Sequence, residues 1–98
     1  MNNYEHELEY EVFLETLLDD EKSYHLVVWN DDVNTFDWVI KTLVEVCQHT
    51  QEQAEQCSLI IHHKGKCTVK EGEFEKLKPI CEAILERGIS ATVESLVS

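Results

Sequence analysis

YHLVVWNDDVNTF, residues 24–36, joins an apolar strand to a polar turn and then to the start of a helix. The four apolar residues at 26–29 favour a buried strand, which we expect to end near residue 30. The polar run NDD breaks that strand. Asn34 is then expected to cap the following helix, with Asp37 near its positive end. The stretch therefore predicts that a sheet and a helix pack together.

The rest of the chain contains further segments with the sequence patterns of helices and strands. Apolar residues recur at steps of three and four after residue 36, and Thr50 with Gln53 forms a capping box for a second helix that ends near Gly65. A third helix stops at Gly88, and Pro79 must lie near its start or kink it. The expected helices cover about residues 34–47, 50–65 and 74–88, and the expected strands cover 24–30, 66–70 and 89–94.

The order strand, helix, helix, strand, helix, strand predicts an α+β fold. A three-stranded antiparallel sheet covered on one face by three helices satisfies this order, because an antiparallel sheet can leave its other face in water. At 98 residues the chain fits one small domain, which we assign to residues 24–98.

Negative charge is concentrated near the N-terminus. The formal net charge is −12, and residues 1–24 carry eight acidic side chains against Lys22 alone. Residues 1–23 therefore predict a flexible acidic extension, either a solvated tail or an arm that becomes helical on a partner. The overall charge disfavours nucleic acid and membrane surfaces as partners and favours protein surfaces.

The state of the cysteines depends on whether the protein lies in a reducing or an oxidising compartment. No basic region followed by an apolar run begins the chain, and no stretch approaches the roughly 20 apolar residues of a membrane span, so we expect a cytoplasmic protein. In a reducing compartment the four cysteines are expected to be buried, free thiols. The alternative is a zinc site, although no Cys-x-x-Cys pair prepares one. Its ligands would be His62, His63, Cys67 and Cys57.

No segment has the pattern of a catalytic site, because there is no phosphate-cradling glycine loop and we identify no nucleophile with its base. Two polar segments remain, WNDDVNTF (29–36) at a strand-to-helix turn and IIHHKG (60–65) at a helix end. We expect them to face each other, and we expect a protein that is not an enzyme and needs no cofactor. A metal-dependent enzyme at the histidine and cysteine cluster is the enzymatic alternative.

Asn-Asp-Asp, followed about thirty residues later by apolar-His-x-x-Gly, resembles the ClpS adaptors of the bacterial N-end rule pathway. The resemblance covers about residues 24–94 and includes the final strand ATVE. It implies an adaptor that binds proteins with a free bulky hydrophobic N-terminal residue and delivers them to a Clp AAA+ unfoldase and protease. The implied partner is the N-terminal domain of a ClpA-like or ClpC-like unfoldase.

The resemblance also implies a binding site, residue by residue. The matching positions are Asn30, Asp31 and His62 for the substrate α-amino group, Asp32 and Asn34 for the path of the peptide backbone, and Phe36, Val39, Ile61 and Ile89 for the hydrophobic pocket. Taken singly, the polar residues are more typical of turns and helix ends than of a binding site, and the apolar ones are more typical of a core. Only their joint spacing favours a site.

The chemistry of a free N-terminus agrees with this assignment. An α-amino group has a pKa of about 7.7 to 8.0, so it is largely cationic at neutral pH and needs carboxylate, amide or imidazole acceptors. Together with a buried Leu or Phe side chain, such bonds predict a dissociation constant on the order of micromolar. We expect peptides beginning with Leu, Phe, Tyr or Trp to bind, and their acetylated forms not to bind.

Departures from the family pattern affect the pocket. Asn34 and Thr35 stand where the family usually has Thr-Pro, Phe36 occupies a gate position that is commonly Met, and Ser58 replaces a residue that is often larger and apolar. The preference among Leu, Phe, Tyr and Trp therefore stays open. A small scaffold domain of a larger assembly, without N-terminal residue binding, is the alternative from a different class.

Overall fold

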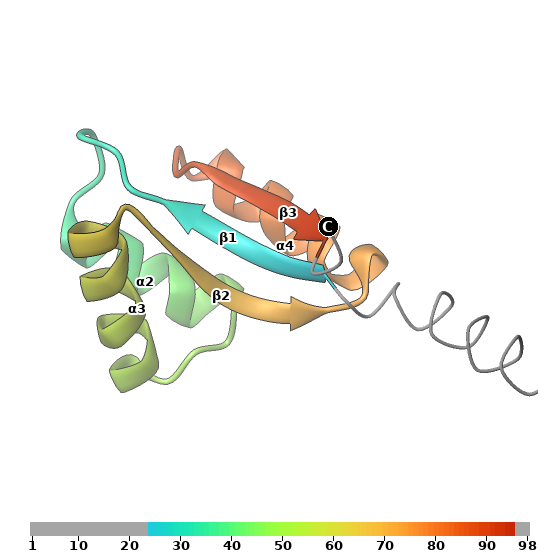
Figure 1. Ribbon diagram of the computed structural model, residues 1–98. Coiled ribbons are helices and arrows are strands. Elements are labelled where there is room, and N and C mark those ends of the chain that lie inside the picture. Colours follow the sequence, from blue (N-terminus) through green and yellow to red (C-terminus); the bar gives the residue numbers. More distant parts are fainter. Residues whose placement is uncertain (1–23, 96–98) are drawn as a thin grey trace, which may run out of the picture.

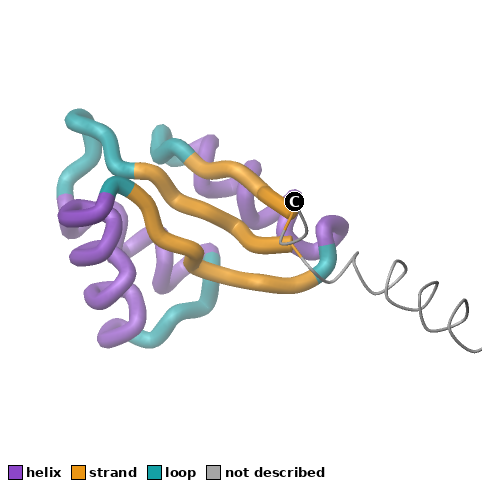
Figure 2. Tube along the Cα trace, viewed as in Figure 1, coloured by secondary structure: helices purple, strands orange, loops and turns teal. Residues whose placement is uncertain are grey.

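The computed structural model of the chain describes residues 24–95, and the predicted acidic extension, residues 1–23, lies outside them. In order, the elements are β1 (Tyr24–Trp29), α2 (Phe36–Val46), α3 (Gln51–Lys64), β2 (Lys66–Gly72), α4 (Phe74–Glu86) and β3 (Ala91–Ser95). Figures 1 and 2 show the strands together at the front of the view, with α2 and α4 behind them. The predicted α+β class and element order are confirmed.

β1 is the central strand of the described sheet. It pairs antiparallel with β2 on one side and with β3 on the other, which gives the strand order β2-β1-β3. Val28 is aligned with Cys67 and with Ala91, and a bulge shifts the β1–β2 register between Leu26 and Val27. All three apolar residues from Leu26 to Val28 are buried, which explains why the sequence of this strand is continuously apolar rather than alternating.

The helices enclose the core on one face of the sheet. α4 packs on all three strands, while α3 lies beside β2 and against α2. The apolar residues of α2 and α4 recur at steps of three and four, so each helix presents one apolar face to its neighbours. The largest fully buried side chains include Leu26, Leu43, Leu77 and Ile84. None of the described helices combines the length and the apolar character needed to cross a membrane.

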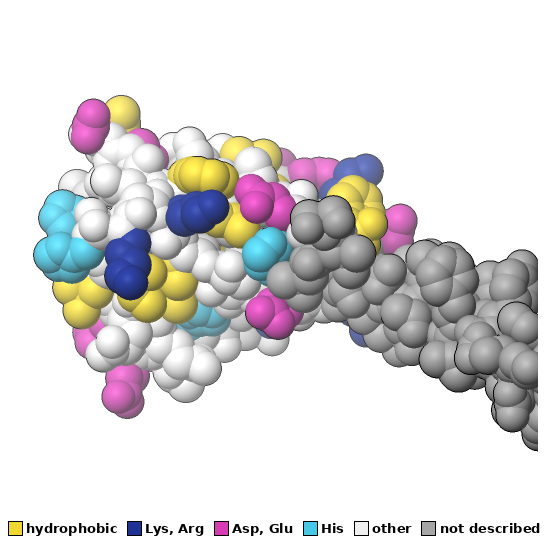
Figure 3. Space-filling model, viewed as in Figure 1, with side chains coloured by type: hydrophobic (Ala, Val, Ile, Leu, Met, Phe, Trp, Pro, Cys, Tyr) yellow, Lys and Arg dark blue, Asp and Glu magenta, His cyan; other side chains and the backbone are white. Residues whose placement is uncertain are grey.

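The other face of the sheet carries a row of cross-strand contacts. Trp29 Nε1 donates to Thr92 Oγ1 at 2.9 Å, and Lys66 Nζ lies 4.9 Å from the Trp29 ring centroid. Thr68 Oγ1 lies 3.2 Å from His25 Nδ1. Figure 3 shows this side of the molecule, where basic, acidic and hydrophobic side chains are interspersed. Such cross-strand pairs stabilise the observed register.

The N-terminal cap of α2 differs from the prediction, whereas both ends of α3 agree with it. Thr35, not Asn34, caps α2, because its hydroxyl accepts the N–H of the residue three positions on at 3.1 Å. The expectation that Asn34 is the cap is wrong by one residue. The capping box of Thr50 and Gln53 is confirmed in both directions, and α3 ends as expected at Gly65, where φ is 93°. A glycine adopts this left-handed conformation without strain.

Three features of the C-terminal half differ from the pattern-based boundaries. β2 continues to Gly72 rather than ending at residue 70, and β3 begins at Ala91 rather than at residue 89. Pro79 lies inside α4, so its missing N–H removes one helical hydrogen bond, to the carbonyl of Glu75. Because β3 begins at Ala91, Ile89 lies before this strand instead of opening it.

Candidate functional site

The loop after β1 and the end of α3 lie against each other. The backbone N–H of Asn30 donates to the carbonyl of Gly65 at 2.8 Å, directly joining the two polar segments. On the other side, the N–H of Trp29 donates to the carbonyl of Ser90 at 3.0 Å. The beginning of the loop is thus held between α3 and the segment before β3. The expectation that the two polar segments face each other is confirmed.

A cavity of about 460 Å³ opens between these segments. Polar side chains of the β1–α2 loop form part of its lining, and apolar side chains of α2 and α3 form another part. The lining residues are Asn30, Asp31, Asp32, Asn34, Phe36, Val39, Ser58, Ile61 and His62. The cavity thus brings together eight of the nine predicted site residues and adds Ser58. Its volume lies within the roughly 300–1,000 Å³ typical of ligand pockets.

Ile89 is the predicted site residue that does not line the cavity. It is 2% exposed and belongs to the core cluster, and its N–H donates to the carbonyl of Ile84 at 3.3 Å. The side chain fills the core beside α4 instead. The sequence pattern could not separate the two environments, because both favour an apolar residue.

Asp31 organises the loop at the polar edge of the cavity. Its Oδ1 accepts the N–H groups of Val33 at 2.8 Å and Asn34 at 2.7 Å, and its Oδ2 accepts Asn34 Nδ2 at 2.7 Å. The backbone N–H of Asn34 is the largest cause of a lowered Asp31 pKa. Partial burial acts in the opposite direction and raises the pKa of Asp31, whereas hydrogen bonds from the Asn34 side chain and the Val33 amide lower it further. Because a carboxylate offers about four acceptor sites, Asp31 retains capacity for another donor.

Asn34 links this loop to the opposite end of the chain. Its Nδ2 also donates to the carbonyl of Gly88 at 2.8 Å, in the turn between α4 and β3. Close by, Trp38 Nε1 donates to the carbonyl of Arg87 at 3.0 Å. The loop and the start of α2 are therefore tied to one turn more than 40 residues away in sequence. The hydrogen bonds of Asn34 explain its presence better than the helix cap that the pattern predicted.

His62 and Phe36 are the exposed members of the lining on the helices. His62 lies in the last turn of α3, with its ring centroid 5.2 Å from that of His63. Phe36 opens α2 and is 41% exposed. Ile61 is buried and Val39 is half-buried, so the apolar part of the cavity lies below an exposed aromatic ring and an imidazole.

The lowered pKa of Asp31 predicts how stability depends on pH. A carboxyl pKa lower in the folded state than its value of about 3.9 in the unfolded chain stabilises the fold above about pH 4, and this contribution is lost as the pH falls through the folded value. We expect Asp31→Asn to lower the melting temperature near pH 7 by roughly 4 °C, or about 1 kcal/mol, and the difference from wild type to shrink as the pH falls below about 4 and through the folded pKa. Circular-dichroism melts across this range provide the measurement. A difference in melting temperature that does not change with pH would contradict this prediction.

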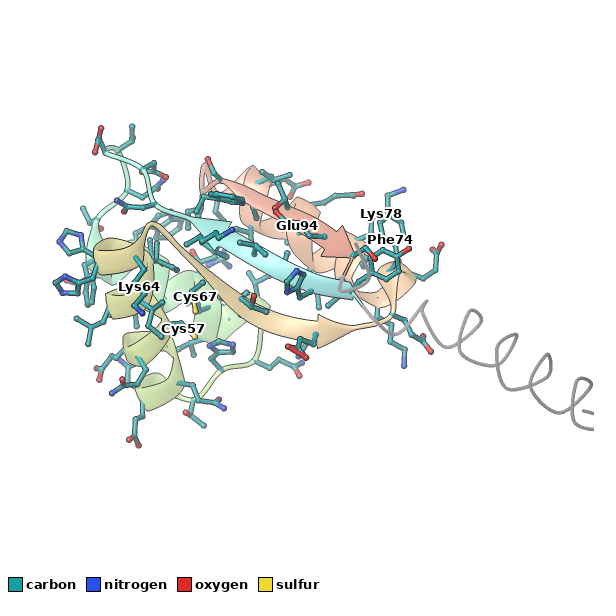
Figure 4. All side chains as sticks on the ribbon, viewed as in Figure 1. Cys57, Lys64, Cys67, Phe74, Lys78 and Glu94 are labelled. Carbon is teal, nitrogen blue, oxygen red and sulfur yellow. The ribbon has the colours of Figure 1, made fainter. Side chains whose placement is uncertain are left out.

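The zinc alternative lacks the necessary geometry. Among residues 24–95, no group of three or more His, Cys, Asp or Glu side chains is arranged to hold a metal ion. Cys57 and Cys67 lie near each other between α3 and β2 (Figure 4), and burial is the main cause that raises the Cys67 pKa to about 12. All four cysteines are free, as expected, but only Cys47 and Cys81 are fully buried.

The cavity has the chemistry of a binding pocket for a cation that carries an apolar group. The Asp31 carboxylate and the His62 ring both line it, and Val39 and Ile61 supply apolar surface in the same lining. Such a site recognises a ligand through a few directed polar contacts and a larger buried apolar contact. Fold and site together define a small α+β ligand-binding domain.

The protein-family model described as "ATP-dependent Clp protease adaptor protein ClpS" matches residues 19–92. The chain therefore belongs to the ClpS family of Clp protease adaptors. ClpS proteins are adaptors without catalytic activity, so membership in the family confirms the expectation that this protein is not an enzyme.

Individual relatives agree with this assignment. A ClpS adapter protein of Helicobacter hepaticus is 35% identical over 71 residues, which cover 70% of this chain and 72% of the relative. One from Campylobacter jejuni is 41% identical over 51 residues, or 52% of this chain and 53% of the relative. The solved structure of Agrobacterium tumefaciens ClpS2 bound to L-phenylalaninamide has a TM-score of 0.68 at 22% identity and covers 74% of this chain and 94% of that chain. This likeness shows that the two share a fold.

Proposed function

We propose that this chain captures proteins through a free, bulky hydrophobic N-terminal residue and delivers them to a Clp AAA+ unfoldase. The observation that carries the proposal is that Asp31, His62, Val39 and Ile61 all line one cavity. Membership in the adaptor family supports it. So does the ligand of the Agrobacterium tumefaciens relative, since phenylalaninamide offers a free α-amino group beside a bulky side chain.

In the proposed complex the α-ammonium group donates to Asn30, Asp31 and His62, while the first side chain enters between Val39 and Ile61. Charge-assisted hydrogen bonds contribute roughly 1.5 to 3 kcal/mol each, and burial of a Leu or Phe side chain contributes a similar amount. After the cost of association, this corresponds to a dissociation constant on the order of micromolar. Such affinity suits an adaptor that must release its cargo.

The remaining predicted contacts concern the rest of the substrate. Asp32 is exposed and Asn34 is half-buried, and both line the cavity beside Asp31. We propose that the peptide backbone leaves the pocket along them. Phe36 then closes over the first side chain as a gate, which its 41% exposure at the start of α2 supports.

The proposed partner is the N-terminal domain of a ClpA-like or ClpC-like unfoldase in the cytoplasm. The acidic extension, residues 1–23, is proposed to act on this partner rather than on the peptide. Its charge supports this, because eight acidic side chains within residues 1–24 disfavour contact with the acidic edge formed by Asp31 and Asp32. Residues 24–98 are proposed to form the adaptor domain.

A titration with peptides that differ only in their first residue tests this function. Peptides beginning with Leu, Phe, Tyr or Trp are expected to bind with micromolar dissociation constants, whereas one beginning with Glu should bind at least about a hundredfold more weakly, because its side chain would be buried without a partner. Fluorescence anisotropy measures both. As a control, moving the bulky residue to the second position should abolish its advantage. Affinities that do not depend on the first residue would favour the scaffold alternative.

A further inference from the structure

Ser58 is a buried polar residue in the lining of the cavity. It lies in the middle of α3 and is 2% exposed. Its hydroxyl oxygen is inaccessible to solvent and forms no hydrogen bond with any described residue. A buried hydroxyl without a partner is uncommon in native proteins and carries a desolvation cost. Because Ser58 lines the cavity, rotation about its Cα–Cβ bond turns the hydroxyl toward a bound ligand, which can then supply the missing partner.

The position of Ser58 on α3 defines which part of a ligand it meets. Ser58 and His62 are four residues apart, so they share a helix face, with a rise of about 6 Å between them. His62 is exposed, whereas Ser58 is buried, so Ser58 marks the deeper part of the cavity. A ligand whose α-amino group lies beside His62 and Asp31 therefore directs the far end of its side chain toward Ser58. The separation is close to the length of a tyrosine side chain.

We propose, on the basis of the function above, that Ser58 is a specificity-determining residue that favours N-terminal tyrosine over phenylalanine. The serine hydroxyl both donates and accepts, as does the tyrosine phenol, so the two satisfy each other inside the cavity. Phenylalanine and leucine fill the same space but leave Ser58 unpaired. A site that can hydrogen-bond a ligand hydroxyl discriminates against the analogue that lacks it, because the polar group of the site is then buried without a partner.

Affinity measurements on a double-mutant cycle test this proposal. The cycle combines wild type and Ser58→Ala with two peptides that differ only in Tyr or Phe at the first position. Wild type is expected to bind the tyrosine peptide roughly three to ten times more tightly, and Ser58→Ala should reduce this ratio to about one or invert it, since the phenol then lacks a partner. The measured quantity is the Tyr:Phe affinity ratio. Removal of the Ser58 oxygen enlarges the cavity, which by itself would favour the longer tyrosine, so a fall in the ratio reports the lost hydrogen bond.

Two further variants control for structural effects. Ser58→Thr keeps the hydroxyl and should retain a ratio above one, although its extra methyl group lowers affinity for both peptides. Ser90→Ala removes an exposed hydroxyl outside the cavity lining and should leave the ratio as in wild type. Circular dichroism verifies that each variant is folded. Ser58→Ala should fold, because alanine is the strongest helix former.

The outcomes separate this proposal from the proposed function. If wild type binds peptides without regard to the first residue, the proposed function fails, and the role of Ser58 fails with it. If wild type binds both peptides tightly but favours phenylalanine, or if Ser58→Ala leaves a tyrosine preference intact, only the role of Ser58 is overturned. A tyrosine preference that disappears in Ser58→Ala and persists in Ser58→Thr supports both.

Discussion

Asp31→Ala is expected to weaken binding of a peptide that begins with free phenylalanine by roughly a hundredfold, or about 2.7 kcal/mol. The change removes a carboxylate proposed to accept the α-ammonium group, a charge-assisted bond of about 1.5 to 3 kcal/mol. It also removes the three hydrogen bonds to Val33 and Asn34, so the loop must be ordered again when the peptide binds. Fluorescence anisotropy at neutral pH measures the loss.

Two variants divide this effect into its parts. Asp31→Asn keeps the size of the side chain and one acceptor oxygen, so it removes the charge and the acceptor for either the backbone N–H groups or the Asn34 side chain, while retaining the other. Asp37→Asn removes the same charge from an exposed position in the first turn of α2, outside the cavity lining, and is expected to change affinity by no more than about twofold. If Asp31→Ala binds as tightly as wild type while remaining folded, Asp31 is a turn residue only and the α-amino site lies elsewhere.

Acetylation of the peptide N-terminus is expected to reduce affinity by several hundredfold or more. The acetylated nitrogen carries no charge and offers one N–H instead of three, so it cannot satisfy Asn30, Asp31 and His62 together. The Asp31 carboxylate would then be covered by the ligand without a compensating charge, which adds a cost of about 3 kcal/mol. A competition titration with otherwise identical free and acetylated peptides measures the difference.

A matched peptide separates the charge of the N-terminus from acetylation in general. A peptide acetylated on a lysine side chain several residues from its free N-terminus loses one positive charge but keeps the α-ammonium group. It is expected to bind within about twofold of the unmodified peptide, because an exposed charge far from the site is largely screened. Equal affinity of the N-terminally acetylated and free peptides would overturn the assignment of Asp31 and His62 to the α-amino group.

Much of the fold could be predicted because its signals are local. The apolar run before the NDD turn predicted β1, and the Thr50 and Gln53 pair predicted the start of α3. Gly65 predicted the end of α3, since the left-handed turn there favours glycine. Each of these signals lies within a few residues of the structure that it specifies. The boundaries of β2 and β3 were less accurate, because pairing with β1 extends or shortens a strand regardless of its own pattern.

The start of α2 shows where local signals fail. Asn34 and Thr35 are both good N-cap residues, and the sequence alone does not choose between them. In the folded chain the N–H of Asn34 is taken by Asp31, and its side-chain amide binds both Asp31 and the carbonyl of Gly88. Asn34 is therefore committed to the loop, and Thr35 caps the helix. The Gly88 contact spans 54 residues of sequence, so no local pattern contains it.

For this protein the sequence by itself determined the order of strands and helices and, through a motif repeated in a known family, most of the residues around the cavity. The periodicity and turn chemistry that carry this information are properties of short segments. Only the tertiary structure decided that Ile89 fills the core, that the Ser58 hydroxyl is buried and unpaired among the described residues, and that Asp31 holds the loop. These facts depend on which distant segments meet, and the apolar or polar character of a residue does not reveal its neighbours in space.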